Sequence, residues 1–183
     1  MKRTLALIVS LLLLLAIAAS GQRRRDPLTA DETDQLREAK QEPDKRLKLY
    51  VQFARARMET IEHLRTDPRF AGDRGRQIHD LLEDLGNIVE EMDDNVDMYM
   101  EGKWDIRKAM KEVVQADTEF QLKLRQLKES AAADPALQKE LTQNYEFALQ
   151  DTTEAVNASL DSARKTVDDL ETMAKAKQLR KPE

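Results

Sequence analysis

Apolar residues return every seven positions along most of this chain, and this spacing restricts its fold more than any other feature. The clearest series are Leu47, Ala54 and Ile61; Ile78, Leu85, Met92 and Tyr99; and Ile106, Val113, Phe120 and Leu127. Side chains seven positions apart lie on one face of an α-helix, because two turns take about seven residues. No segment alternates apolar and polar residues as a half-buried strand does. The pattern predicts an all-α fold.

Proline and glycine residues mark the breaks between the predicted helices. Four long helices are expected, at about 44–65, 73–100, 105–132 and 135–179. The fourth has no proline or glycine after Pro135, and its apolar positions recur at an interval of about eleven, which keeps a helix nearly straight. A shorter helix is expected from Thr29 to about Gln41, because Thr29 and Glu32 have the spacing of a capping box.

Short turns favour antiparallel packing of successive helices, so the sequence predicts a single elongated antiparallel four-helix bundle over residues 29–179. The short N-terminal helix is additional to it, and the long C-terminal helix is expected to extend past its neighbours. The segment around Glu32 is acidic and the end of the last helix around Lys175 is basic, which predicts that the two lie side by side. Residues 21–28 are assigned to a flexible linker and 180–183 to a tail.

Residues 1–20 have the composition of a secretory signal peptide. Lys2 and Arg3 precede an apolar run over residues 5–19, and small residues lead to a cleavage site before Gly21. The alternative is an uncleaved anchor, because the run is close to the shortest that spans a bilayer. Under both interpretations the bundle is exported, to the periplasm or the extracellular space. Under the second, residues 5–19 tether it to a membrane.

Composition excludes several classes of function. The 183 residues include no cysteine, which rules out disulfides, thiol catalysis and cysteine-based metal sites. The five glycines are scattered, so no phosphate-binding loop is present. A formal net charge of -5 argues against nucleic acid as a partner. No serine of the mature chain lies in a glycine-flanked elbow, and the protein is predicted not to be an enzyme.

Two histidine–glutamate pairs are the candidates for a metal site. Glu59 and His63 lie four positions apart in the first long helix, and His79 and Glu83 do so in the second. Imidazole and carboxylate ligands suit zinc or copper. The apolar series, however, places Glu59, His63 and Glu83 on the outer side and His79 at the margin. Solvent-exposed side chains are therefore the preferred interpretation, and no metal or cofactor is predicted.

An acidic run late in the second helix contains Asp93, Asn95 and Asp97, which resembles the opening of a calcium loop. Such a loop needs glycine at its sixth position and glutamate at its twelfth, where this chain has Met98 and Trp104. The run is interpreted as the solvated face of a helix.

Two aromatic residues are the candidates for contact with a partner. Phe70 lies in the turn after the first long helix, where its ring is expected to be presented outward. Trp104 comes directly before Asp105, the expected N-cap of the third helix. For Trp104 a hydrophobic staple over Ala109 is preferred to a binding role.

An exported acidic bundle without convergent reactive groups favours a function based on its surface. The expected function is a non-catalytic protein–protein interaction module, such as a scaffold or a chaperone-like protein. Its partner is an unidentified protein, and a homodimer is a further expectation, because dimerisation would bury more of the apolar stripes. The alternatives are a bundle that binds a metal or small ligand and a membrane-tethered coiled-coil rod.

Overall fold

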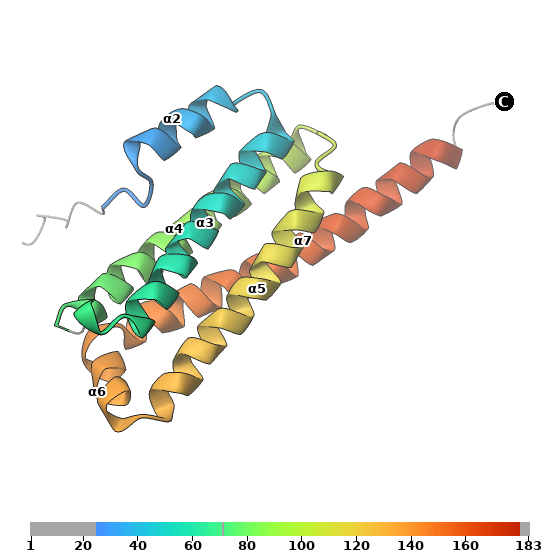
Figure 1. The fold of residues 1–183 in the computed structure, drawn as a ribbon. Helices are drawn as coiled ribbons and strands as arrows, with labels where there is room; N and C mark the ends of the chain where they lie inside the picture. The colour runs from blue at the N-terminus through green and yellow to red at the C-terminus, as the bar shows by residue number, and fades with distance from the viewer. Residues whose placement is uncertain (1–24, 71, 180–183) are drawn as a thin grey trace, which may run out of the picture.

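A computed structural model describes residues 25–70 and 72–179, and all regular structure in these ranges is helical. The elements are α2 (Ala30–Glu38), α3 (Pro43–Thr66), the 3₁₀ turn η1 (Pro68–Phe70), α4 (Arg74–Glu101), α5 (Arg107–Ala132), α6 (Pro135–Asn144) and α7 (Glu146–Leu179). The long helices run up and down beside one another (Figure 1). The predicted all-α helical bundle is confirmed.

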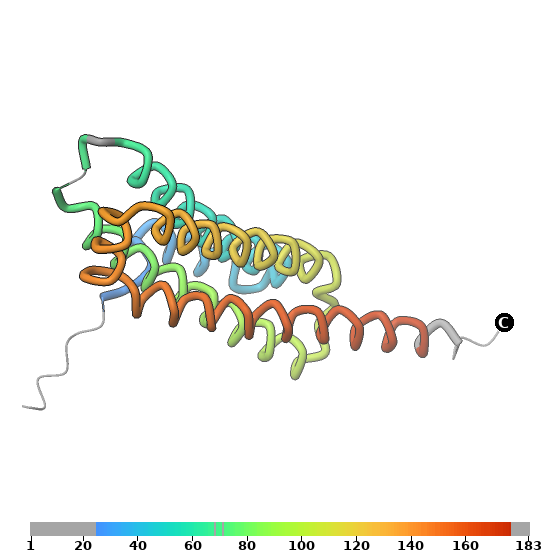
Figure 2. The backbone as a smooth tube through the Cα atoms, turned by 90° about the horizontal axis from the view of Figure 1, so that it is seen from below, coloured from blue at the N-terminus to red at the C-terminus, as the bar shows by residue number. Residues whose placement is uncertain are grey.

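The four long helices form the corners of the bundle. α3 and α7 each pack against both α4 and α5, so α4 and α5 occupy opposite corners. Figure 2 shows the same arrangement from below, with α7 extending well past the turn that joins α4 to α5. The predicted overshoot of the C-terminal helix is therefore present.

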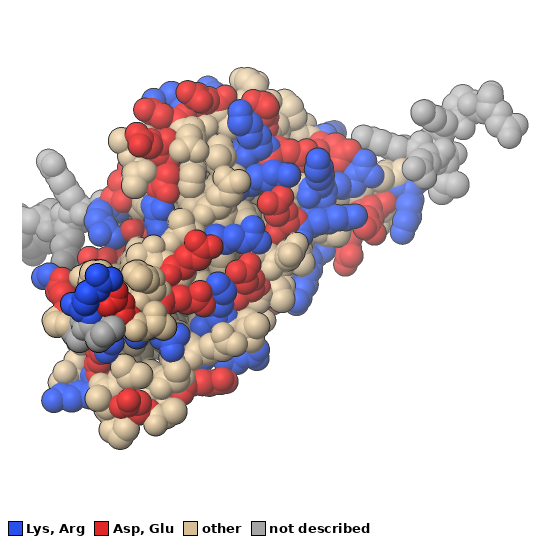
Figure 3. Space-filling model, in the orientation of Figure 1, with Lys and Arg blue, Asp and Glu red and all other residues tan. Residues whose placement is uncertain are grey.

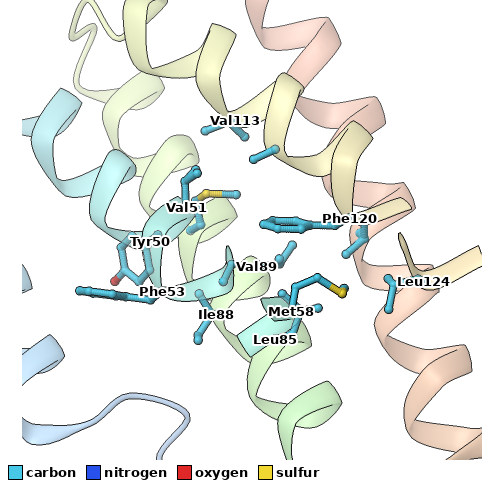
Figure 4. Close-up of a cluster of buried hydrophobic side chains, with 14 of the residues drawn as sticks. Tyr50, Val51, Phe53, Met58, Leu85, Ile88, Val89, Val113, Phe120 and Leu124 are labelled. Carbon is cyan, nitrogen blue, oxygen red and sulfur yellow. The ribbon is translucent and has the colours of Figure 1, made fainter. Parts of the chain in front are cut away.

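The centre of the bundle is filled by the predicted apolar series. Figure 4 shows Phe120 pointing from α5 toward side chains of α3 and α4, among them Met58 and Val89. All three are at most 2% exposed. Truncation of a buried phenylalanine to alanine costs about 3–5 kcal/mol, because transfer free energy is lost and a cavity remains. Burial along these stripes, rather than intrinsic helix propensity, holds the bundle together.

Two predicted helix starts are confirmed. The Thr29 hydroxyl accepts from the Glu32 backbone N–H at 3.2 Å, and the Thr29 N–H donates to the Glu32 carboxylate at 2.8 Å, which completes a capping box. Asp134 caps α6 by accepting from the Ala136 N–H at 2.8 Å, with Pro135 at the first helical position.

The predicted start of the third helix is wrong. Ile106, which is fully buried, occupies the N-cap of α5 in place of Asp105. One backbone N–H group in the first turn of α5 is capped from another helix instead. Asp44 of α3 accepts from the Ala109 N–H at 3.1 Å. Asp105 binds the side chain of Arg107, with 2.8 Å between the guanidinium Nε and the carboxylate.

The last predicted helix is not continuous. It is divided at Tyr145, whose φ of -140° and ψ of 16° lie outside the helical region. The Tyr145 ring is 3% exposed, and α6 packs against α4 and α5 at the end of the bundle. The interruption lets α6 close this end while α7 runs back along the core. No proline or glycine marks it, so the sequence carried no local signal.

The predicted pairing of the first helix with the end of the last is also wrong. α2 lies along α3 instead (Figure 1), and the end of α7 extends without it. The Glu32 carboxylate forms an ion pair with Arg57 of α3, both side chains being about one-tenth exposed. Arg57 also donates to the Pro27 carbonyl at 2.6 Å. A shielded pair with additional hydrogen bonds outweighs exposed pairs, which contribute only about 0.2–1 kcal/mol each.

In the described ranges, no helix has both the length and the apolar character needed to cross a membrane. The predicted signal peptide or tether, residues 1–20, and the predicted tail lie outside the described residues, as does the first half of the predicted linker, residues 21–24.

Candidate functional site

The four metal candidates lie on the surface. Glu59, His63 and Glu83 are exposed and His79 is partly exposed, as the apolar series indicated. His63 has Asp67 at 3.9 Å, and His79 has Glu83 at 3.9 Å. Among the described residues, no three histidine, aspartate or glutamate side chains are grouped as a metal site requires.

Phe70 is less exposed than its place in a turn suggests. Its ring is half-buried against the hydrophobic core, and its edge meets the His63 ring with 6.0 Å between centroids. The Arg69 guanidinium covers it at 5.9 Å from the ring centre. Little of the ring remains to contact a partner.

Trp104 is placed differently from the predicted staple. Its ring packs edge-on against Tyr99 of α4, with 6.4 Å between centroids. A Cβ at Gly102 would come within 2.7 Å of this ring, so glycine allows the close approach. Lys103 adopts a left-handed conformation with φ of 57°, which folds the turn back on α4. Trp104 remains 48% exposed.

Trp104 lines an apolar groove between the α4–α5 turn and the far part of α7. We call it the Trp104 groove, and it is formed by Met100, Trp104, Leu170, Met173 and Ala174. Met173, in the C-terminal part of α7, is 55% exposed; the end of this helix passes the end of the bundle (Figures 1 and 2). Two large apolar side chains thus stand about half exposed on one concave surface.

Basic side chains border this groove. Lys103, Asp105 and Arg107 also line the groove, and an adjoining hollow adds Lys108 and Lys111 together with Asp44 and Glu171. Figure 3 shows Lys and Arg gathered over the start of α5, with carboxylates between them. Arg107 is paired with Asp105. The three lysines form no ion pair within the described ranges.

Phe147, near the start of α7, is the most exposed large apolar side chain described, at 79%. The periodic pattern of the sequence did not predict this exposure. Phe147 lies between the buried Tyr145 and Ala148 but outside the apolar series to which they belong. This offset is the sequence signal that could have indicated its exposure.

A second feature lies inside the bundle and was also missed. The Ser159 hydroxyl of α7 is 2.8 Å from Asp93 Oδ1 of α4 and 3.0 Å from Asp117 Oδ2 of α5. Asp117 and Ser159 are fully buried, and Asp93 is half-buried. Asp117 Oδ1 has no hydrogen-bond partner among the residues that the structure describes. Two carboxyl groups from opposite corners of the bundle therefore meet at one hydroxyl, and we call this set the acid pair.

Burial alters the protonation of the acid pair. It raises the pKa of Asp117 to about 7 and that of Asp93 to about 6, because a carboxylate loses its hydration in the core. Hydrogen bonds from Ser159 oppose this rise in both. The acidic run of α4 was interpreted as a solvated helix face. Among its aspartates this is wrong for Asp93, whereas Asp94 and Asp97 are exposed.

Comparison with protein-family models, with curated proteins and with solved structures finds no match to this chain. The proposals below therefore depend on its own residues.

Proposed function

We propose that this protein is an exported, non-catalytic helical bundle that binds another protein, and that the Trp104 groove is the binding surface. The observation that carries the proposal is the pair of half-exposed side chains, Trp104 and Met173, on one apolar groove. Tryptophan and methionine are enriched at the centres of protein interfaces. Residues 1–20 support export through their signal-peptide composition.

The proposed occupant is an amphipathic helix whose apolar face is flanked by acidic residues. A groove between a helix and a turn accepts one apolar helix face, which is a common mode of recognition. Lys103, Lys108 and Lys111, which form no ion pair with a described residue, lie on or beside the rim and select for carboxylates. Such charges contribute mainly to specificity and association rate, while the apolar contact supplies most of the affinity.

A non-catalytic role is supported by the position of the reactive groups. The carboxyl groups brought together by the fold, Asp93 and Asp117, meet at Ser159 in the core. The exposed candidates Glu59, His63 and Glu83 are not grouped with a third ligand in the described ranges.

Trp104 is the only tryptophan in the chain, so its fluorescence reports on the groove directly. Two synthetic amphipathic helices with the same apolar face would be titrated, one with glutamate flanks and one with lysine flanks. We expect the acidic helix to shift the emission to shorter wavelength, with weaker binding at high salt. The basic helix should bind at least tenfold more weakly.

Met173→Ser should weaken binding of the acidic helix, and Met98→Ser is the matched control. Met98 is exposed to a similar extent, 53%, but does not line the groove. Equal affinity for both helices, or an equal effect of both substitutions, would refute the proposal. If the emission of the protein alone shifts with its own concentration, the occupant is a second copy of the chain and the proposed acidic partner is wrong.

A further inference from the structure

We infer that Asp93, Asp117 and Ser159 form a proton-binding site that fastens α7 to α4 and α5, so that the packing of α7 weakens as this proton is lost. The site is separate from the Trp104 groove and does not depend on the proposed function.

A single hydroxyl hydrogen, that of Ser159, is available to the two carboxyl groups. Ser159 holds one hydroxyl hydrogen, and it can donate that hydrogen to one carboxylate at a time. Its oxygen nevertheless lies within 3.0 Å of an oxygen of each aspartate. Both contacts are hydrogen bonds only when one carboxyl group is protonated and donates to the serine oxygen. With both aspartates ionised, one contact would place two oxygen lone pairs against each other.

Burial indicates which aspartate holds the proton. Asp117 is fully buried and its Oδ1 has no partner. Leaving a charged oxygen unpaired in the core is far more costly than leaving a neutral one. Asp93 lies closer to solvent and accepts at 2.8 Å. We therefore assign the proton to Asp117, the donated serine hydrogen to Asp93, and the negative charge to Asp93.

The surrounding charges do not compensate a second negative charge. From α4, Asp97, Asp94 and Glu90 act on Asp93, and all are acidic. Among the described residues, the charge that acts on Asp117 is that of Asp93. α7 contributes the neutral Ser159. The side chains that α3 buries between α4 and α5 are uncharged: Leu47, Tyr50, Val51, Phe53, Ala54, Met58, Ile61 and Leu64. Complete ionisation would therefore put two uncompensated carboxylates beside one hydroxyl.

The proton connects this chemistry to the movement of α7. When α7 separates from α4 and α5, water reaches the aspartates and their pKa values return to the ordinary range near 4. Between about pH 4 and pH 7 the packed site holds the proton and the separated site does not. Separation of α7 therefore releases the proton in this pH range. In that interval the equilibrium constant for opening rises by roughly tenfold per pH unit. It becomes constant once the packed site is itself ionised.

Amide hydrogen exchange of the purified protein tests the inference. Protection factors of α7, corrected for the intrinsic exchange rate, would be measured from pH 5 to pH 8. We expect protection to fall by up to roughly tenfold per pH unit and to level off above about pH 7. Asp117→Asn keeps the shape without the ionisation of Asp117, so the pH dependence should disappear above about pH 6, where Asp93 is already ionised. Asp94→Asn removes a charge from the exposed face of α4 and should preserve it.

Protection in α7 that is independent of pH, or an equal response of both variants, would overturn the inference. Should Asp117→Asn fail to fold, the carboxyl carbon resonances of the unaltered protein provide a second test. A carboxyl group of Asp117 that titrates near 4 would refute the proton site, and one that titrates near neutrality would support it.

Discussion

Replacement of Asp117 by asparagine should remove most of the pH dependence of folding stability between pH 5 and pH 7. In the folded protein, burial raises the pKa of Asp117 to about 7, whereas in the unfolded chain it is about 3.9. Between these values the folded state holds a proton that the unfolded state has lost. The contribution of Asp117 to stability is therefore complete below about pH 4 and declines as the pH rises toward 7.

The magnitude follows from the number of pH units crossed. A whole unit costs about 1.4 kcal/mol for one proton, and because Asp117 is half ionised by pH 7 the interval from pH 5 to pH 7 costs about 2.3 kcal/mol. Asparagine remains neutral, so the variant should keep only the smaller change of about 1.3 kcal/mol that Asp93 contributes through its own raised pKa. At pH 8 the variant should be more stable than the unaltered protein, because it buries an amide instead of a carboxylate.

Urea unfolding followed by circular dichroism at pH 5, 6, 7 and 8 measures this difference. The stability of the variant minus that of the unaltered protein cancels the contributions of other titrating groups. We expect this difference to rise with pH up to about 7 and then to remain constant. A difference independent of pH would show that Asp117 is ionised in the folded protein throughout, and the assignment of the proton would be wrong.

Three further predictions concern the rest of the chain. Arg57→Ala should destabilise the protein by about 3 kcal/mol in urea unfolding, because it leaves the shielded carboxylate of α2 without its partner; Arg37→Ala, which removes an exposed pair, should cost less than about 0.5 kcal/mol. Gly86→Ala should raise stability by up to about 1 kcal/mol in thermal unfolding, because its Cβ would meet Thr152 at an ordinary 3.5 Å while the helix gains propensity; a loss would show that α4 and α7 need to be closer. N-terminal sequencing of the exported protein should begin at Gly21, and a start at Met1 would contradict cleavage.

The fold could be predicted because it depends on a repeated signal. The seven-residue interval identifies the buried face of each long helix, and single exceptions do not obscure it. Helix ends were predictable where a side chain of the same segment forms the cap, as at Thr29 and Asp134. Helix ends were not predictable where the capping group belongs to another helix. At the N-terminus of α5, the carboxylate of Asp44 in α3 accepts from a backbone N–H group.

The acid pair illustrates how a local interpretation missed a site that the periodicity contained. Asp117 lies seven positions from both Met110 and Leu124, and all three are buried. A carboxyl group inside an apolar series breaks the rule that buried positions are apolar, and such departures are expected at functional or strained positions. Asp93 had no comparable signal, because it belongs to an acidic run on α4. Its burial depends on the approach of α7, which only the tertiary structure shows.

α7 connects the acid pair with the Trp104 groove. It supplies Ser159 to the aspartates and, about three turns later, Leu170 and Met173 to the groove. Trp104, on the opposite wall, packs against Tyr99 of α4 instead. Because the two walls of the groove belong to helices that the acid pair joins, loss of its proton would alter their separation. Binding of an acidic helix at Trp104 would then weaken as the pH rises.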